Sequence, residues 1–525
     1  MILGKTIATL RSKAKLTQEQ LAEILGVSQQ SVQKWESGSV TPDLEKVIRI
    51  SKHFGVSLDA LILGNDNRIV EELSNTKQIK PQYQNMHAWE VYCSNLMTEY
   101  KQCVDEGLDV AVYKDVFSSV SMLPISEVKK KLGDALFEAV SNAPIREDYK
   151  YSEPSDIDKI RALRGELTPL AEVDKKNLAD KVYGAWLGRV VGCMLGKTVE
   201  GIRTDELVRL LKKTDNYPMH RYIVTDDISG DNVKGYSFMF GAPFADKIDG
   251  MPSDDDTNYV VLAQEVINTY GRSFTPFDMS CAWLDLQKKE AYCTAERVAF
   301  CNFIKGYAPT ESAMYKNPFR EWIGAQIRGD YFGYINPGNP ELAADMAWRD
   351  ASISHIKNGI YGEMFIAAML AVAATTKDIK TVITRGLAEI PYTSRLYEDV
   401  MSIVNAYDCG KTLFDAYDMI NEKYDEKTSY GWCHTNSNAM IVVASLLWGN
   451  GDFTRSIGNA VQIGFDTDCN GATVGSIVGM MMGSSCISPQ WLAPINDKLH
   501  TTIFGVGTVK ISECARKTME HIVLP

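Results

Sequence analysis

Two clusters of aspartate are the residues of this sequence whose types and spacing best suit chemistry. Asp466 and Asp468 stand two positions apart in GFDTDCNGATVGSIVGMMMG, and Asp254, Asp255 and Asp256 are consecutive in PSDDDTNYVVLAQEVINTYG. In an extended loop, side chains at positions i and i+2 point the same way, so such a loop aims its acids at one ligand. Acids before a helix also cap it and complement its dipole, and that explanation accounts for either cluster alone.

The two clusters together predict a site for cations. Five carboxylates that converge repel one another strongly unless a cation lies between them. Ligand sets made only of oxygen select hard ions such as Mg²⁺, Mn²⁺ or Ca²⁺ rather than Zn²⁺. Two small clusters can bridge a pair of ions about 3.5–4 Å apart, as in two-metal sites. A third acidic stretch, residues 225–227, is followed by no helical period, so we interpret it as a turn-rich loop.

Repeated glycines predict the helices that position these acids. Glycine recurs at every fourth position from Gly184 to Gly196 and again from Gly471 to Gly483. On a helix, positions i and i+4 share a face, so each segment carries a glycine stripe. Each glycine costs a helix about 1 kcal/mol relative to alanine, which only tight packing offsets. We therefore expect both helices in the core, beside each other or beside a common neighbour. Residues 363–376 predict a further buried helix, apolar on nearly every side.

Length and charge indicate a globular protein of more than one domain. The chain has 525 residues, 45% of them hydrophobic and 23% charged, so two or three domains are expected. Its net charge of −12 argues against general nucleic-acid binding. However, residues 1–65 hold eight Lys/Arg and six Asp/Glu, a balance of +2 that leaves −14 for the rest. This asymmetry indicates that the N-terminal region has a different partner.

Cysteine usage and hydropathy predict a cytoplasmic protein. The eleven cysteines form neither a CxxC pair nor a tight cluster, which predicts free thiols in a reducing compartment. The N-terminus lacks the apolar core and the cleavage site of a secretory signal. The run from Cys469 to Asn496 is uncharged, but Pro489 and Pro494 interrupt it, so we expect no membrane span.

Residues 1–65 are predicted to form short helices. TQEQLAEILG begins with a capping box at Thr17 and ends at Gly26, while SQQSVQKWESG is capped by Ser28 and ends at Gly38. Two such helices joined by a glycine turn form the helix-turn-helix pattern. The order of these residues resembles the phage-repressor (Cro-like) DNA-binding family over essentially the whole stretch. The resemblance implies a five-helix domain that binds double-stranded DNA.

The same resemblance implies which residues contact DNA. In this family the second helix enters the major groove with its N-terminal residues on base edges. The candidates there are Gln29, Gln30 and Ser31, with Lys34 one turn later and Gln18 on a phosphate. Glutamine bonds adenine through both ends of its amide, which suits the double glutamine. A homodimer on a palindromic site is the expected arrangement; the competing hypothesis is a small helical bundle used only for dimerisation.

Residues 66–173 are predicted to be a connector with helical segments. SEVKKKLGDALFEAVSNA and YSEPSDIDKIRALRG have helical character, and we find no chemistry in this region. A spacer or a lid is the expected role. From Leu170 onward helix follows helix with few alternating β runs, so the expected fold class is all-α.

The C-terminal region resembles the ADP-ribosylglycohydrolase family. GAWLGRVVGCMLGKTVEG, SDDDTNYVVLA, SHIKNGIYGEMF and GFDTDCNGATVGSIVG follow the order of that family's motifs, from about Asp174 to the C-terminus. The resemblance implies an all-α orthogonal bundle over residues 174–525, with a centre of two Mg²⁺ ions, for which Mn²⁺ is an alternative. It also implies cleavage of ADP-ribose from arginine, serine or other acceptors.

The resemblance assigns the metal ligands residue by residue. The family's Thr-Asp-Asp triplet falls on Asp254, Asp255 and Asp256. Its Asp-x-Asp-Thr/Ser motif falls on Asp466, Asp468 and Cys469. Asp254 replaces a threonine and adds charge, while Cys469 replaces a hydroxyl with a thiol that suits Mg²⁺ poorly. We therefore expect five aspartate ligands and do not count Cys469 among them.

Catalytic and substrate-binding residues also follow from the resemblance. The family's glutamate after its first glycine motif falls on Glu200, as general base or gate. The Gly-Asp pair early in that motif is Gly192-Cys193 in this sequence, so a cysteine replaces the aspartate. Asp255 and Asp466 are the other catalytic candidates, because carboxylates stabilise the oxocarbenium-like transition state of glycosidic cleavage. The substrate-binding candidates are His355, Asn358 and Tyr361. A surface acid and a structural histidine are the plainer explanations of Glu200 and His355.

Three functional hypotheses follow. The first is a Mg²⁺-dependent hydrolase that releases ADP-ribose and carries a DNA-binding domain. The second is a transcription regulator whose C-terminal domain senses an ADP-ribose-like ligand without turnover, and the third is a structural descendant with an inactive site. The acceptor of ADP-ribose and the DNA operator are open at this point.

Overall fold

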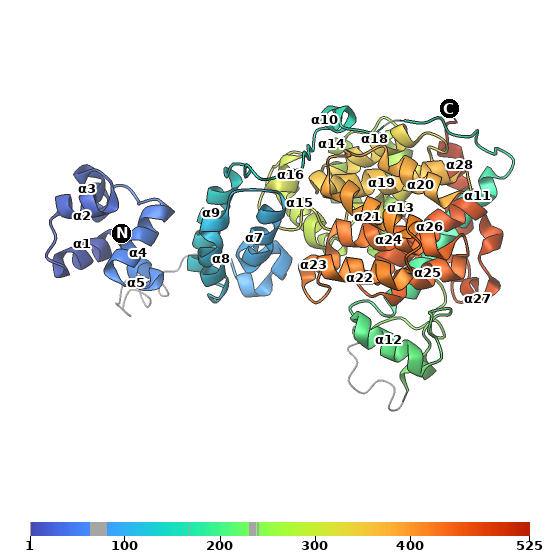
Figure 1. Ribbon diagram of the computed structural model, residues 1–525, viewed down its shortest axis with the longest axis horizontal. Helices are drawn as coiled ribbons and strands as arrows, with labels where there is room; N and C mark the ends of the chain where they lie inside the picture. The colour runs from blue at the N-terminus through green and yellow to red at the C-terminus, as the bar shows by residue number, and fades with distance from the viewer. Residues whose placement is uncertain (1, 64–80, 166, 230–237, 239–240, 525) are drawn as a thin grey trace. The chain divides into compact units, whose positions relative to one another are not determined.

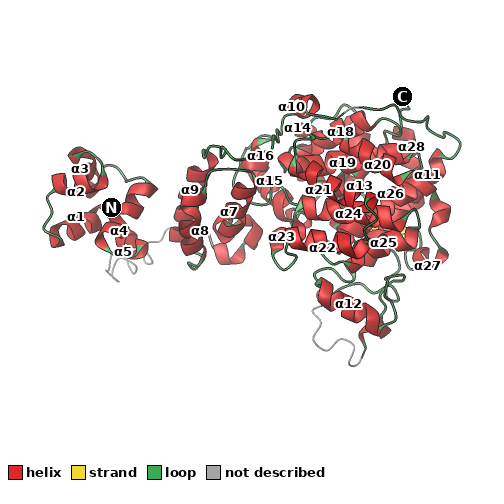
Figure 2. Ribbon diagram, in the orientation of Figure 1, coloured by secondary structure: helices red, strands yellow, loops and turns green. Residues whose placement is uncertain are grey.

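The protein consists of two compact helical units. The computed structural model describes residues 2–63, 81–165, 167–229, 238 and 241–524. The chain divides into residues 1–85 and residues 86–525, each compact by itself. Helices dominate both units (Figure 1, Figure 2). The described residues form one sheet, in which β1 (Lys498–His500) pairs antiparallel with β2 (Thr508–Lys510), with Leu499 opposite Val509. The all-α prediction is confirmed.

The first unit contains the five expected helices. They are α1 (Ile2–Lys13), α2 (Gln18–Leu25), α3 (Gln29–Ser37), α4 (Leu44–Phe54) and α5 (Leu58–Leu63). Thr17 and Gln20 form the predicted capping box, and Ser28 caps α3 by accepting from the backbone of Ser31. Left-handed glycines, Gly26 and Gly38, end both helices as expected.

The apolar side chains of this unit close a small core of their own. They are Ile7, Leu21, Ala22, Leu25, Val32, Trp35, Val47, Ile50 and Leu61. The helical period of the sequence places four of the five from α2 and α3 in one apolar seam, namely Leu21, Leu25, Val32 and Trp35. The hydrophobic burial that holds α2 against α3 therefore comes from within residues 1–65.

Residues 86–165 belong to the second unit and pack closely against its body. Their helices are α7 (Leu96–Asp105), α8 (Lys114–Ser121), α9 (Glu127–Ser141) and α10 (Ile157–Ala162). Buried ion pairs join them to later residues. Arg320 pairs with Glu99 at 3.0 Å and with Glu106 at 2.6 Å, and Arg395 pairs with Glu153 at 2.8 Å. Part of the region predicted as a connector is thus built into the larger unit.

The remaining helices form the body of the second unit. They are α11 (Leu178–Lys197), α12 (Thr204–Lys213), α13 (Asp255–Tyr270), α14 (Pro276–Leu286), α15 (Thr294–Ile304), α16 (Glu311–Met314), α17 (Asp330–Tyr334), α18 (Pro340–Ala351), α19 (Lys357–Ala373), α20 (Ile379–Leu387), α21 (Arg395–Asp408), α22 (Leu413–Lys423), α23 (Ser429–Cys433), α24 (Thr435–Gly449), α25 (Phe453–Gln462), α26 (Thr467–Met482), α27 (Pro489–Leu492) and α28 (Ile511–His521). Figure 1 shows α13, α19, α24 and α26 gathered in the middle of this unit, and α26 contacts each of the other three.

The two glycine stripes pack against each other. Each glycine of α11 approaches the backbone of α26 so closely that a Cβ would overlap it. Gly188 meets the carbonyl of Gly475, and Gly192 meets that of Gly471. The predicted partnership of these helices is confirmed. The expected buried helix is α19, whose side chains from Asn358 to Ala373 are all buried.

No helix among the described residues is long and apolar enough to cross a membrane.

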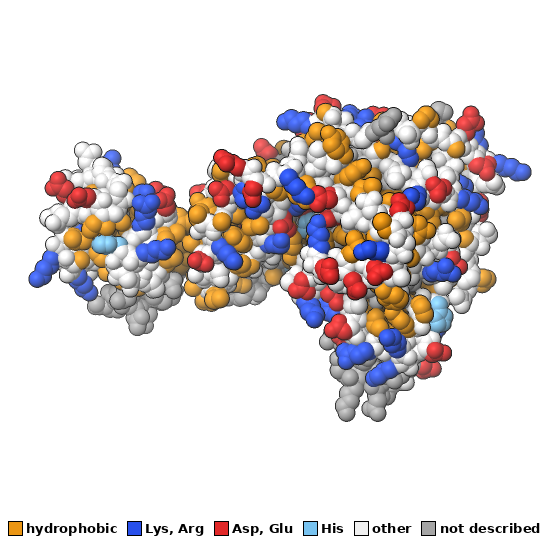
Figure 3. Space-filling view, in the orientation of Figure 1, with side chains coloured by type: hydrophobic (Ala, Val, Ile, Leu, Met, Phe, Trp, Pro, Cys, Tyr) orange, Lys and Arg blue, Asp and Glu red, His pale blue; other side chains and the backbone are white. Residues whose placement is uncertain are grey.

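On the face of the second unit drawn in Figure 3, acidic and basic side chains are interspersed. A further group of acids is buried where α11, α13 and α26 meet.

Candidate metal centre

The two predicted acidic loops meet in space. Asp256 and Asp468 come together with Cys469, with their potential ligand atoms all within 4.8 Å of one another. Asp254 and Asp256 form a second such trio with Cys193. Asp256 is common to both trios, so the 254–256 loop and the 466–468 loop bound one continuous site.

Helix capping explains only one of the two loops. Asp254 is the N-cap of α13, and its carboxylate accepts a hydrogen bond of 2.9 Å from the backbone N–H of Asp256. Asp466 holds the same position on α26 but makes no side-chain cap bond within the described structure. Asp466 and Asp468 are only 7% and 3% exposed. Since burial of uncapped carboxylates is costly, these two acids need another reason to be there.

Helix α11 supplies basic and sulfur-bearing side chains to the same site. Arg189 donates to Asp256 at 2.8 Å and to Asp330 at 3.0 Å, and all three side chains are fully buried. Cys193 donates to Asp254 at 3.2 Å, and Lys197 forms an ion pair with the other oxygen of that carboxylate. These three residues are spaced by four, so they line one face of α11 beside its glycine stripe.

Sequence reasoning missed Arg189 and Lys197. The signal was present, because each basic residue directly follows a glycine of the repeating stripe, at Gly188 and Gly196. A stripe that faces α26 places the next residue of each turn toward the end of α13. An arginine or lysine at such a position has a buried partner only if acids lie opposite.

Burial and mutual repulsion together shape the electrostatics of the carboxylates. Asp468, together with burial, raises the pKa of Glu200 to about 11. Burial and the neighbouring Asp254 raise the pKa of Asp255 to about 7. Burial also raises the pKa of Asp256 and of Asp466 well above the ordinary value. The cluster therefore holds more negative charge than its protein surroundings compensate.

Asp254 is the exception within the cluster. Its burial acts to raise the pKa, but the adjacent Lys197 ammonium outweighs burial and lowers it. Asp254 is therefore ionised and neutralised by a protein cation. Arg189, by contrast, is shared between Asp256 and Asp330, so it does not neutralise Asp256 alone. The remaining carboxylates of the cluster suit divalent cations as counter-charges.

The residues present fit divalent cations. Asp256 Oδ2 and Asp468 Oδ1 are buried and have no hydrogen-bond partner within the described ranges of the chain. Buried carboxylate oxygens without a donor are costly, and a cation is the ligand that such oxygens suit. Glu200 and Asp255 are partly exposed, so the cluster opens to solvent on their side.

The three substrate-binding candidates occupy buried positions at the start of α19 and just before it. His355 shares a hydrogen bond of 2.8 Å with Ser354. Asn358 donates to Glu153 and to Glu321, both at 2.8 Å, and Tyr361 donates to the carbonyl of Pro154. Two of these partners come from the 86–165 segment. The contact of these candidates with substrate stays a prediction.

The acidic stretch at residues 225–227, interpreted from the sequence as a turn-rich loop, forms a short 3-10 helix (Thr225–Ile228). Asp227 forms an ion pair with Arg221, with one carboxylate–guanidinium distance of 2.7 Å, and accepts from the backbone of Val224. Neither metal trio includes this aspartate.

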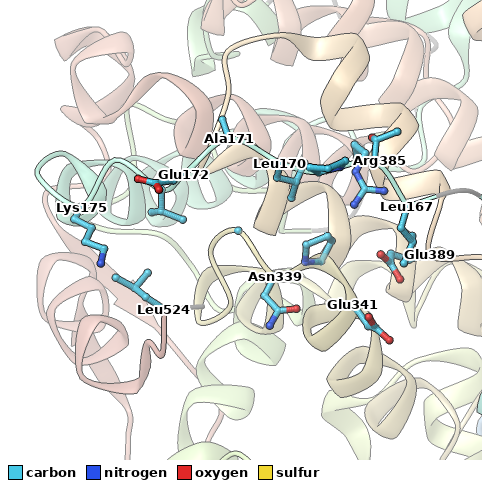
Figure 4. Close-up of a pocket in the computed structure, with 15 residues that line it drawn as sticks. Leu167, Leu170, Ala171, Glu172, Lys175, Asn339, Glu341, Arg385, Glu389 and Leu524 are labelled. Atoms are coloured by element: carbon cyan, nitrogen blue, oxygen red, sulfur yellow. The ribbon is translucent and has the colours of Figure 1, made fainter.

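A separate groove of about 520 Å³ lies between the extended segment 167–173, the start of α18 and α20 (Figure 4). Figure 4 shows Leu170 and Arg385 close together at one end, and Lys175 and Leu524 at the other. Its lining includes none of the residues predicted to act in catalysis, metal binding or DNA binding.

The DNA-contact candidates lie at the start of the second helix of the helix-turn-helix pair. Gln29, Gln30 and Lys34 are exposed on α3, while Ser31 is half-buried and bonds Ser28. Gln18, at the start of α2, donates to Glu36 at 2.7 Å. The exposed glutamines are thus available to a partner, and their contact with bases stays a prediction.

Comparisons with known proteins agree with this division of the chain. A family model described as ADP-ribosylglycohydrolase matches residues 174–519, and one described as helix-turn-helix matches residues 7–61. The chain is similar to the HTH-type transcriptional activator BcrR of Enterococcus faecalis. The two are 30% identical over 148 residues, which cover 24% of this chain and 71% of BcrR.

One more regulator and one solved structure are also similar to this chain. The HTH-type transcriptional regulator MJ0272 of Methanocaldococcus jannaschii is 39% identical over 57 residues, which cover 11% of this chain and 86% of that protein. A solved structure called ADP-ribosylglycohydrolase-related protein complex aligns with a TM-score of 0.40 and 18% identity. That alignment covers 66% of this chain and 98% of the solved one.

Proposed function

The chain belongs to the ADP-ribosylglycohydrolase family through residues 174–519 and to the helix-turn-helix family through residues 7–61, and from that premise we propose a DNA-binding hydrolase. Its reaction is cleavage of the glycosidic bond of an ADP-ribosylated protein, nucleic acid or small molecule, with release of ADP-ribose. Its site of action is the cytoplasm, where eleven cysteines unpaired with one another stay reduced.

The observation that carries this proposal is the meeting of two acidic loops at the ends of α13 and α26. Asp255, Asp256, Asp466 and Asp468 would hold two divalent cations, with Mg²⁺ as the ion that the family implies and Mn²⁺ as an alternative. Asp254 would support them from its ion pair with Lys197. Bound cations supply the charge that orients ribose hydroxyls and polarises a water at the anomeric carbon.

The chain's own carboxylates would handle protons and positive charge during cleavage. Glu200 and Asp255 are partly exposed at the open side of the cluster, where a substrate has access. Cations on Asp468 and Asp466 would offset the repulsion that raises the pKa of Glu200, and we assign proton transfer with the attacking water to the ionised Glu200, as general base. Asp255 and Asp466 would stabilise the oxocarbenium-like transition state, because both place negative charge where positive charge develops.

The first unit would bring this activity to DNA. Helix-turn-helix relatives are named as transcriptional regulators. Gln29, Gln30 and Ser31, with Lys34 one turn later, would meet base edges in the major groove, while Gln18 would meet a phosphate. Two copies of the chain on a palindromic site is the proposed arrangement.

One observation favours a second candidate function. Lys197 places an ammonium inside the acidic cluster, on Asp254. A cluster that contains its own cation can bind an ADP-ribose-like ligand without turning it over. The chain would then be a transcription regulator that senses this ligand.

Product analysis distinguishes the two functions. The full chain is incubated with ADP-ribosyl-arginine, ADP-ribosyl-serine and an ADP-ribosylated oligonucleotide, with and without Mg²⁺ or Mn²⁺. We expect free ADP-ribose from at least one of them, none in the presence of a chelator, and none from Asp466→Asn. Binding of ADP-ribose that changes DNA affinity, without any release from these substrates, selects the sensor instead.

A further inference from the structure

We propose that one of the two cation positions, formed by Asp256, Asp468 and Cys469, is a mixed oxygen–sulfur site for a borderline transition ion such as Zn²⁺, Fe²⁺ or Co²⁺. This inference rests on the proposed cation centre and specifies its chemistry. The other position, near Asp254, binds a cation weakly because Lys197 already forms an ion pair with Asp254.

The geometry of the trio is suited to ligation. The ligand atoms of Asp256, Asp468 and Cys469 all lie within 4.8 Å of one another, and the residues are only 0%, 3% and 6% exposed. One oxygen of each aspartate is buried without a hydrogen-bond partner in the described part of the chain. A thiol and one oxygen of each carboxylate therefore share one small space, and each carboxylate also has a buried oxygen without a partner.

The trio is also held rigidly. Asp468 and Cys469 are neighbours in the first turn of α26, a helix fixed by its glycine contacts with α11. Arg189 donates to one carboxylate oxygen of Asp256, Oδ1, at 2.8 Å and to the backbone carbonyl of the same residue at 3.0 Å. This contact leaves Oδ2 as the oxygen available to a cation. Preorganised ligands of this kind favour tight binding.

Sulfur decides which ion the trio prefers. Thiolates select Zn²⁺, Fe²⁺ and other borderline ions, whereas Mg²⁺ requires oxygen ligands and keeps much of its water. A binding ion displaces the proton of Cys469 to solvent, so that the ligand set becomes one thiolate and two carboxylates. That set, three protein ligands with room for water or substrate, is typical of catalytic transition-metal sites.

The neighbouring trio of Cys193, Asp254 and Asp256 is less suited to bind a cation. In Asp254, Oδ1 accepts from the Cys193 thiol at 3.2 Å and from the Asp256 backbone at 2.9 Å, and Oδ2 is paired with Lys197. Both oxygens are already satisfied. Cys193 thus serves as a hydrogen-bond donor to Asp254, and its thiol is the internal control for Cys469.

Cobalt spectroscopy tests the proposal on the full chain. The cation-free protein, prepared with a chelator, is titrated with Co²⁺, because cobalt bound to thiolate shows a sulfur-to-metal charge-transfer absorption in the near ultraviolet. We expect this absorption to saturate at one equivalent per chain, to persist in excess Mg²⁺, to vanish in Cys469→Ser and to remain in Cys193→Ser. The affinity lost in Cys469→Ser should exceed the roughly 10–100-fold that loss of an outer-shell partner costs.

Several outcomes overturn the proposal. They are an absorption that survives Cys469→Ser, one that disappears in Cys193→Ser, and one that saturates at two equivalents. If Cys469→Ser does not fold, the wild-type spectrum still decides, because a centre of oxygen ligands gives no such absorption. The readout is independent of hydrolysis, so a chain that binds Co²⁺ through sulfur but releases no ADP-ribose refutes the proposed function alone.

Discussion

At the scale of single residues, the candidate centre differs from a simple set of acids through its internal cation. Lys197 is 21% exposed and pairs with Asp254, whose side chain is 1% exposed. A buried carboxylate that loses its partner is left with an uncompensated charge, which is strongly destabilising. The pair therefore stabilises the cation-free protein and lowers the demand for a metal at that position.

Replacing the lysine tests this reasoning. Lys197→Met should lower the free energy of unfolding by about 3 kcal/mol in the presence of a chelator, because Asp254 becomes unpaired. Added Mg²⁺ or Mn²⁺ should restore a large part of the loss, since a divalent cation then balances Asp254. Urea unfolding with and without the cation measures both effects.

The matched control for this substitution is Lys377→Met, at an exposed lysine. It should change the free energy of unfolding by less than about 0.5 kcal/mol. Equal stability of Lys197→Met and wild type in chelator would show that the ion pair contributes nothing.

His434 is a second residue whose burial has a measurable consequence. Burial lowers its pKa from the ordinary 6.5 to about 4, although Glu321, Asp105 and Asp399 act in the opposite direction. The folded protein keeps this imidazole neutral between those values, whereas the unfolded chain binds a proton below 6.5. Stability should therefore be flat above pH 6.5 and fall as the pH drops from 6.5 to 4, by about 3 kcal/mol for this group.

Comparison with His434→Asn isolates the contribution. The imidazole Nδ1 accepts from the backbone of Asn436 at the start of α24, and asparagine is also a good helix cap. The difference in unfolding free energy between wild type and variant should shrink by about 3 kcal/mol from pH 7 to pH 4. A difference that is constant over this range would contradict a neutral buried histidine.

At the scale of helices, the packing of α11 on α26 holds the centre together. Their glycines let the two backbones touch. Arg189 and Lys197 of α11 thereby pair with Asp256 and Asp254, and Asp256 also lies beside Asp468 and Cys469 of α26. Two helices with ordinary side chains lie about 8–10 Å apart. The stripe is thus the structural reason that acids far apart in the chain share one site.

A methyl group at this contact should separate the helices. A Cβ at Gly475 overlaps the carbonyl oxygen of Gly188, a backbone atom that no side-chain rotation can move away. Gly475→Ala should therefore destabilise the protein by about 2–3 kcal/mol and weaken cation binding. Thermal unfolding and cation titration measure the two effects.

Gly165→Ala provides the comparison for that substitution. The nearest atom to a Cβ there is the Cα of Ala388 at 3.8 Å, an ordinary contact. Its stability should stay within about 0.5 kcal/mol of wild type. If Gly475→Ala is as stable as Gly165→Ala, the glycine contact does not hold the centre.

Local sequence signals predict the positions of these helices better than their electrostatic partners. Some signals act through nearby backbone and can be predicted from the sequence alone. They are the helix cap at Thr17, the helix ends at Gly26 and Gly38, and the glycine stripes. Arg320 was not recognisable as a buried residue. Its partners, Glu99 and Glu106, lie more than two hundred positions away, and charged residues in amphipathic helices usually face water.

The candidate site was predictable to a similar degree. Spacing and resemblance identify the acids, because carboxylates in loops before helices form a recurrent pattern. Capping by Asp254 was also predictable, because a cap acts through the adjacent backbone, but its neutralisation by Lys197 depends on which face of α11 meets α13. The packing of the whole core sets that orientation, so it cannot be predicted from a short stretch of sequence.

At the scale of the whole molecule, the two proposed activities belong to two different units. The glutamines of α3 belong to the first unit, and the acidic cluster belongs to the second. Each unit has its own hydrophobic core. Substitutions in one unit should therefore leave the other folded and active.

The glutamine pair provides a test of this separation. Gln30→Ala should weaken binding to a cognate operator by about 1–3 kcal/mol, the amount that one bidentate base contact contributes. Release of ADP-ribose should be unchanged. Electrophoretic shift and product analysis on the same preparation measure both, with the reverse pattern expected for Asp466→Asn. Loss of both activities in Gln30→Ala would contradict independent units.

The central claim is that acids from α13 and α26 together bind divalent cations. The most direct measurement is calorimetric titration of the chelator-treated chain with Mn²⁺, for wild type, Asp256→Asn and Asp468→Asn. We predict heat of binding in the wild type and its loss in both variants, because each substitution removes a ligand of the same cation position. Absence of uptake by the wild type, or uptake unchanged in either variant, would contradict it.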